Sequence, residues 1–70
     1  MVDYKYKLSI IIPMYNAEKY IGICLDSILD SSLLKEEYEI VIVNDGSKDK
    51  SPEIAQDYAS KYSNVTYLTQ

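Results

Sequence analysis

Apolar runs of strand length alternate along this chain with stretches of helical period, and this alternation limits the folds that it can adopt. Leu8–Ile12 is apolar apart from Ser9, and Tyr38–Val43 is rich in β-branched residues. Continuous apolar runs of this length are typical of parallel strands buried on both faces. A third run with strand character covers Val65–Thr69. The sequence therefore predicts three strands separated by two helices.

The segments between the strands carry apolar residues at the spacing of a helix face. This spacing predicts helices over residues 17–31 and 52–62. Asn16 is a favourable N-cap for the first helix and Ser51 for the second, where Pro52 takes the first helical position. Each helix is therefore expected to begin shortly after a strand ends.

The order of elements, β-α-β-α-β with short connections, predicts an α/β fold with a parallel sheet. Right-handed crossovers allow the strand orders 3-2-1 and 2-1-3, of which we predict 3-2-1. In that order the Leu8–Ile12 strand lies at an edge, where so apolar a strand needs cover. We therefore interpret residues 1–70 as a single truncated domain, the first part of a larger sheet, and expect self-association through this edge strand.

The composition excludes several kinds of site. The net charge is −4, and seven lysines are spread along the chain without any arginine, which argues against a nucleic-acid surface. Histidine is absent, so an imidazole base or metal ligand is excluded. Cys24 is the only cysteine, so no internal disulfide can form, and its place on the first helical stripe predicts a buried side chain. No apolar run is long enough to span a bilayer.

A short polar cluster follows each of the first two strands. Pro13 leads into Met14-Tyr15-Asn16, and the second strand leads into Asn44-Asp45-Gly46-Ser47. The carboxyl ends of parallel strands line the crevice in which ligands of α/β proteins bind. Both clusters are therefore expected on one rim of the sheet, about 5 Å apart.

Two interpretations stay open for these polar residues. Asp45 either caps its own turn or accepts hydrogen bonds from a nucleobase or ribose, while Gly46 allows the backbone to come close to a ligand. Tyr15 either packs on the first helix or lies against a flat ring, and exposed N–H groups at the helix start attract phosphate. Asp49 belongs either to the start of the second helix, which we favour, or to the rim.

Common nucleotide and metal motifs are missing. The chain has only two glycines, so it contains neither the Gly-x-Gly-x-x-Gly turn of dinucleotide-binding proteins nor a Walker loop. No pair of carboxylates has metal-ligand spacing at a strand end.

Together the two clusters resemble the start of a family-two glycosyltransferase with the GT-A fold, a Rossmann-like three-layer sandwich. The resemblance runs from Lys7 to about Leu68 and rests on Ser-Ile-Ile-Ile-Pro-Met-Tyr-Asn and Glu-Ile-Val-Ile-Val-Asn-Asp-Gly-Ser. It implies that these segments bind the nucleotide of a sugar donor, often UDP. The implied donor-binding residues are Pro13, Met14, Tyr15, Asn16, Asp45, Gly46 and Ser47, of which the first three flank the base and ribose, Asp45 hydrogen-bonds the base and the last two shape its loop.

This sequence departs from the family pattern at two positions. Asn44 stands where the family often has a first acid, and Ala17 stands where a glutamate often follows the asparagine. From the resemblance we expect the family's Asp-x-Asp element, its acceptor site and its catalytic base to lie beyond Gln70. The resemblance therefore implies no catalytic residue or metal ligand in this segment, which is expected to be inactive alone. It implies a divalent metal, Mg or Mn, in the full-length enzyme, which we expect in the cytoplasm or on the cytoplasmic face of a membrane.

Two other functions remain compatible with the residues. A small flavodoxin-like or receiver-like binding module shares the β-α-β-α-β order, but a receiver needs more acids at the first strand end than Pro-Met-Tyr-Asn supplies. A self-associating structural fragment without a ligand is the other alternative.

Overall fold

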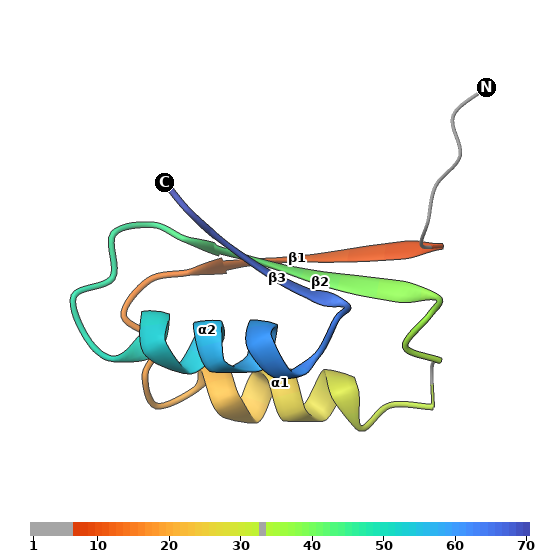
Figure 1. The fold of residues 1–70 in the computed structure, drawn as a ribbon. Coiled ribbons are helices and arrows are strands. Elements are labelled where there is room, and N and C mark those ends of the chain that lie inside the picture. The colour runs from red at the N-terminus through yellow and green to blue at the C-terminus, as the bar shows by residue number, and fades with distance from the viewer. Residues whose placement is uncertain (1–6, 33) are drawn as a thin grey trace.

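The computed structural model describes residues 7–32 and 34–70 (Figure 1). Three strands and two helices alternate along the chain, which confirms the predicted β-α-β-α-β order. They are β1 (Leu8–Met14), α1 (Ile21–Leu29), β2 (Tyr38–Asn44), α2 (Ser51–Lys61) and β3 (Val65–Thr69).

The three strands form one parallel sheet in the order β1-β2-β3, so the predicted order 3-2-1 is confirmed. The register aligns the strand ends, because Met14 pairs with Asn44 and Asn44 pairs with Thr69. The loops that follow β1 and β2 therefore leave the sheet at the same end, the carboxyl end of the strands, on the left in Figure 1.

Both helices lie on one face of the sheet (Figure 1). This follows from two right-handed crossovers that advance in the same direction. No element among residues 7–32 and 34–70 covers the opposite face, where Ile11 and Leu68 are 59% and 49% exposed. The described residues thus form two layers of the expected three-layer sandwich.

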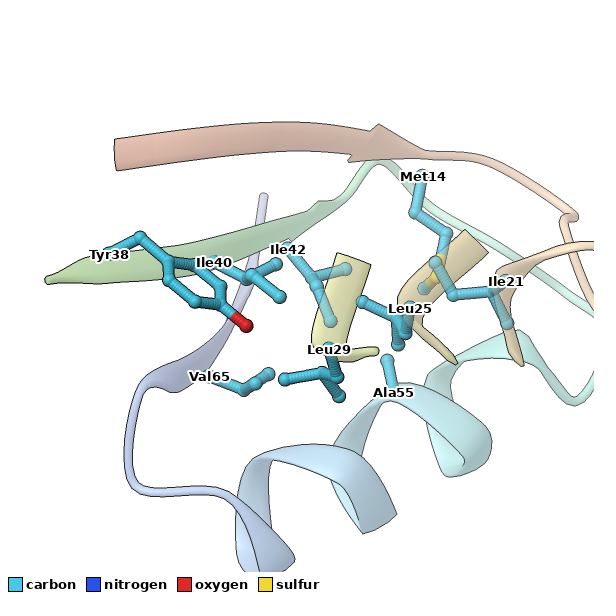
Figure 2. Close-up of a cluster of buried hydrophobic side chains, with 9 residues drawn as sticks. All are labelled: Met14, Ile21, Leu25, Leu29, Tyr38, Ile40, Ile42, Ala55 and Val65. Carbon is cyan, nitrogen blue, oxygen red and sulfur yellow. The ribbon is translucent and has the colours of Figure 1, made fainter. Parts of the chain in front are cut away.

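A single hydrophobic core fills the space between the sheet and the helices (Figure 2). Alternate residues of β2 point into it, as the period of a strand requires, and every second position from Tyr38 to Asn44 is buried. Helix α1 contributes residues four apart, which lie on one helix face. The buried hydrophobic residues are Met14, Ile21, Leu25, Leu29, Tyr38, Ile40, Ile42, Ala55 and Val65.

Strand β1 runs through Pro13 and ends at Met14, two residues beyond the apolar run Leu8–Ile12 that predicted it. The main chain of β1 bonds to β2 through alternate residues, with Leu8 N donating to Glu37 O and Met14 O accepting from Asp45 N. Pro13 falls between these positions, and its nitrogen therefore points to the free edge of the sheet. Proline is tolerated there because no ladder hydrogen bond is lost.

Helix α1 is shorter than the predicted range 17–31, and the predicted N-cap is wrong. Asn16 has a φ of 48°, in the left-handed region, and the chain then makes a turn in which Ala17 O accepts from the backbone N–H of Tyr20. Tyr20 therefore occupies the N-cap position, without a side-chain cap.

The prediction that Cys24 is buried is also wrong, because its side chain is exposed. The apolar stripe of α1 is wider than the face that meets the sheet. Ile21, Leu25 and Leu29 are buried, whereas Cys24, which lies beside them on the stripe, is exposed.

Helix α2 agrees with the predicted range 52–62 to within one residue at each end, but its cap differs. Ser51 is the first helical residue, and Lys50 holds the N-cap position without a side-chain bond. Asp49 accepts the hydrogen bond from Ser51 N instead, at 2.9 Å. The favoured role of Asp49 at the helix start is therefore confirmed.

Candidate functional site

The candidate site is formed by two loops at the carboxyl edge of the sheet, residues 15–20 after β1 and residues 45–50 after β2 (Figure 1). The backbone ladder between β1 and β2 ends with Asp45 N, which donates to Met14 O at 2.9 Å. Beyond that bond the loops stay together through side chains.

Asn16 makes the first pair of these links. Its backbone N–H donates to Ser47 Oγ at 2.9 Å, and its Oδ1 accepts from Lys48 N at 2.8 Å. The left-handed backbone of Asn16 is compatible with this geometry, since asparagine adopts that region more readily than most residues.

Two carboxylates make the second pair. Glu18 N donates to Asp49 Oδ2 at 3.0 Å, and Lys50 N donates to Glu18 Oε1 at 3.2 Å. Partners in all four links are 31 or 32 residues apart, close to the separation of 30 between paired residues of β1 and β2. The links therefore continue the strand register with side-chain acceptors. We call this set the loop clasp; it consists of Asn16, Glu18, Ser47, Lys48, Asp49 and Lys50.

Hydrogen bonding lowers the pKa of Asp49 from its ordinary value of 3.8. The largest cause is the Ser51 hydroxyl, which donates to Asp49 Oδ1, and the backbone N–H groups of Ser51 and Glu18 act in the same direction. Asp49 is thus an ionised acceptor that uses both of its oxygens.

The turn after β2 is held from inside by Asn44. This side chain is buried; its Oδ1 accepts from Ser47 N at 3.0 Å, and its Nδ2 donates to Tyr67 Oη at 2.9 Å. Gly46 has a φ of 80°, which residues with a Cβ rarely adopt. The conformation of Asp45 and Gly46 is therefore fixed without any contribution from the Asp45 side chain.

These contacts bear on one interpretation of each residue, namely that Asp45 caps its own turn and that Tyr15 packs on the first helix. Asn44, and not Asp45, caps the turn, and no donor among the described residues bonds to the Asp45 carboxylate, which is exposed. Tyr15 is 61% exposed, so its ring is mostly free of α1. The structure leaves one carboxylate and one aromatic ring available on two loops that are fastened together.

The remaining predicted residues differ in what they offer a ligand. Pro13 and Gly46 are exposed, and Ser47 is half-buried with its hydroxyl in the loop clasp. Met14 is only 1% exposed, and its side chain packs in the core (Figure 2). Only the main chain of Met14 is therefore available to a ligand in the site. Asn16 has its Oδ1 occupied by Lys48 N.

The described residues do not fit a metal site. No group of three or more Cys, Asp or Glu in residues 7–32 and 34–70 is placed to hold a metal ion, and we assign them no metal-binding role.

A separate cavity of about 260 Å³ opens between the helices and is lined by Asp26, Asp57, Tyr58, Lys61 and Tyr62. There the Tyr58 hydroxyl donates to Asp26 Oδ1 at 2.6 Å, which raises the pKa of Tyr58 to about 12. None of the predicted donor-binding residues lines this cavity.

The sequence prediction missed Glu18 and Tyr67 as parts of this region, and it placed Asn44 in the second cluster without predicting that its side chain holds the turn. Lys48 and Lys50 enter it only through their backbone N–H groups, which no side-chain pattern announces. One signal was available in the sequence. Asn16 and Glu18 are polar acceptors two residues apart, and they pair with the backbone N–H groups of Lys48 and Lys50, which are also two residues apart.

Comparison with known proteins identifies the family. The profile described as glycosyl transferase family 2 matches residues 9–70, nearly the whole chain. The chain belongs to this family. The poly(ribitol-phosphate) beta-glucosyltransferase of Bacillus spizizenii is 47% identical over 62 residues, which cover 89% of this chain and 10% of that protein.

Solved structures agree with this assignment. S. aureus TarS 1–349 in complex with UDP-GlcNAc superposes with a TM-score of 0.83 at 38% identity, over 91% of this chain and 18% of that one. The mannosyltransferase PcManGT of Pyrobaculum calidifontis, solved with GDP-Man and Mn2+, gives 0.82 at 25% identity, over 96% and 20%. The predicted GT-A type of fold is confirmed, and the chain spans about a tenth to a fifth of the lengths of these relatives. Neither described helix is long and apolar enough to cross a membrane.

Proposed function

We propose that this segment forms the nucleoside-binding end of the donor site of a glycosyltransferase. The enzyme would transfer a sugar from a nucleotide-diphosphate donor of the UDP type to an acceptor hydroxyl. Residues 1–70 would be the N-terminal part of its GT-A domain.

One observation carries the proposal: Tyr15 and Asp45 are exposed on loops whose backbones are fixed at the carboxyl edge of the sheet. The Tyr15 backbone is held by one hydrogen bond on either side. Before it, Asp45 N donates to Met14 O in the strand ladder, and after it, Asn16 N donates to Ser47 Oγ in the loop clasp. A ring and an acceptor held in this way suit a flat, hydrogen-bonding base at the position where α/β sheets bind ligands. Gly46 leaves space beside them, since nothing lies within 4 Å of a Cβ built there.

The relatives support the class of donor. TarS has been solved with UDP-GlcNAc and with UDP, and PcManGT with GDP-Man. We favour UDP because TarS is the more similar of the two. In this proposal Asp45 accepts from the base N–H, Tyr15 lies against the base, and Pro13, the Met14 main chain and Gly46 border the pocket.

The chemistry of transfer belongs to parts of the enzyme outside these residues. Inverting transfer needs a base to deprotonate the acceptor and stabilisation of the leaving diphosphate. We propose that the downstream chain supplies both, together with a divalent metal, and that the enzyme works at the cytoplasmic side of a membrane or in the cytoplasm. Self-association of the isolated segment through β1 stays a prediction.

The test is the KM for the donor in the full-length enzyme carrying Asp45→Ala. Loss of an acceptor that bonds the base costs about 1–3 kcal/mol, which corresponds to a KM raised roughly 5- to 150-fold. The kcat is expected to change little, since the contact is the same in the ground state and the transition state.

Two further variants sharpen the result. Asp45→Asn keeps one acceptor oxygen and should fall between wild type and Asp45→Ala. Glu36→Ala removes an exposed acid that precedes β2, at the other end of the strands, and should leave the KM unchanged. An unaltered KM in Asp45→Ala would reject the proposed site.

A further inference from the structure

Four of the six residues of the loop clasp are not among those implied to bind the donor, yet the clasp joins the two loops that carry the donor-binding residues. These four are Glu18, Lys48, Asp49 and Lys50. Tyr15 directly precedes Asn16, and Asp45 and Gly46 directly precede Ser47. Apart from the ladder bond at Asp45 N, the clasp supplies the hydrogen bonds between the loops after β1 and β2 that the structure shows.

The carboxylates of Glu18 and Asp49 close the far end of the clasp. Each accepts a backbone N–H from the opposite loop, so the two contacts are reciprocal. Asp49 also bonds the first residue of α2 through Ser51 N, which ties the clasp to a helix packed on the core. A shift of either loop would break at least one of these bonds.

We infer that Glu18 and Asp49 are positioning residues of the donor site, which hold Tyr15 and Asp45 at the separation that a nucleobase requires. This inference rests on the proposed function. It adds two residues that do not touch the donor and whose loss weakens donor binding by letting the loops separate.

The two carboxylates differ in a way that makes the inference testable. Glu18 uses one of its two carboxylate oxygens: within the described residues, Oε1 accepts from Lys50 N and Oε2 accepts no hydrogen bond. Asp49 uses both oxygens, Oδ2 for Glu18 N and Oδ1 for Ser51. Glu18→Gln keeps one side-chain oxygen, which is enough to accept from Lys50 N. Asp49→Asn replaces one of two oxygens in use by an NH2 group, which cannot accept from Glu18 N or from Ser51 N. Both substitutions remove one negative charge, so they are matched in charge.

The first experiment uses the 70-residue chain without ligand and measures amide hydrogen exchange by NMR. Exchange at Lys48 and Lys50 is expected to be roughly three- to tenfold faster in Asp49→Asn and in Glu18→Ala, the factor that loss of one hydrogen bond allows. Glu18→Gln should match the wild type. Equal exchange in Asp49→Asn and the wild type would overturn the inference regardless of any ligand.

The second experiment measures donor KM and kcat in the full-length enzyme. Asp49→Asn and Glu18→Ala should raise the KM roughly three- to tenfold with little change in kcat, and Glu18→Gln should restore the wild-type KM. Asn64→Ala is the control for loss of stability alone. Asn64 is buried beside the amino end of β3 and donates to Tyr38 O at 3.2 Å, so its loss should lower the Tm and leave the KM unchanged.

The outcomes separate the two proposals. A KM unchanged in Asp45→Ala rejects the donor site itself. A KM that rises in Asp45→Ala and stays at the wild-type value in Asp49→Asn rejects only the positioning role. A KM raised equally by Glu18→Gln and Asp49→Asn, or by Asn64→Ala, would overturn the inference in favour of charge or stability.

Discussion

The contact of Asn44 with Tyr67 should stabilise the turn that presents Asp45. Asn44→Ala removes two hydrogen bonds, one from Ser47 N to Oδ1 and one from Nδ2 to Tyr67 Oη. Each such bond contributes about 0.5–1.5 kcal/mol, so the free energy of unfolding should fall by about 1–3 kcal/mol. In a domain of this size that corresponds to a Tm lower by roughly 4–24 °C.

A double-mutant cycle isolates the contribution of the tyrosine. Tyr67→Phe removes one of the two bonds and should cost about 0.5–1.5 kcal/mol in the wild type. In an Asn44→Ala background its partner is already gone, so the same substitution should cost almost nothing. The assay is urea unfolding of the 70-residue chain followed by circular dichroism. Costs that simply add would refute the contact, and an Asn44→Ala variant as stable as the wild type would refute its role in the turn.

Three more results are expected of the folded chain. Gly46→Val should lower stability by about 1–2 kcal/mol because φ is 80°, and Gly46→Asn should cost less; equal Tm values would contradict this. The pKa of Asp49 is lowered in the fold, so its stabilising effect is present above the ordinary value of 3.8 and is lost as the pH falls through the lower folded pKa. The free energy of unfolding should therefore fall at acid pH more steeply in the wild type than in Asp49→Asn. Identical acid unfolding curves would contradict a stabilising role of the ionised Asp49. Cys24 is exposed and should react with a maleimide in the folded chain about as fast as in urea, whereas strong protection would mean that it is buried.

The fold followed from the sequence because periodicity and topology determine it. Strand-length apolar runs and two helical stripes specify the β-α-β-α-β order, and the handedness of crossovers leaves few arrangements. The errors lie where local propensity and tertiary contacts disagree. Residues 17–20 have helical composition but form a turn, since Asn16 is held to Lys48 in a left-handed conformation.

The error at Cys24 has a different cause. Its place in an apolar stripe is compatible with burial only if both sides of α1 are covered. With the sheet and α2 as its partners, α1 buries residues four apart, Ile21, Leu25 and Leu29, and exposes Cys24. Sequence periodicity gives the apolar stripe but not the width of the surface that meets it.

The site was predictable as a location but not as a structure. Both clusters were placed on one rim from the direction of parallel strands, and they are there. The bonds that hold them join residues 31 or 32 positions apart, and half of the donors are backbone N–H groups of lysines. Such contacts depend on loop geometry that no local sequence pattern encodes.

The most direct test of the donor site is an NMR titration of the 70-residue chain with UDP. Binding is expected to be weak, because the charge-assisted contacts to the diphosphate come from the rest of the enzyme. The proposal predicts saturable shifts centred on Tyr15, Asp45 and Gly46 that disappear in Asp45→Ala. Shifts confined to the cavity between α1 and α2, or shifts that persist unchanged in Asp45→Ala, would contradict it.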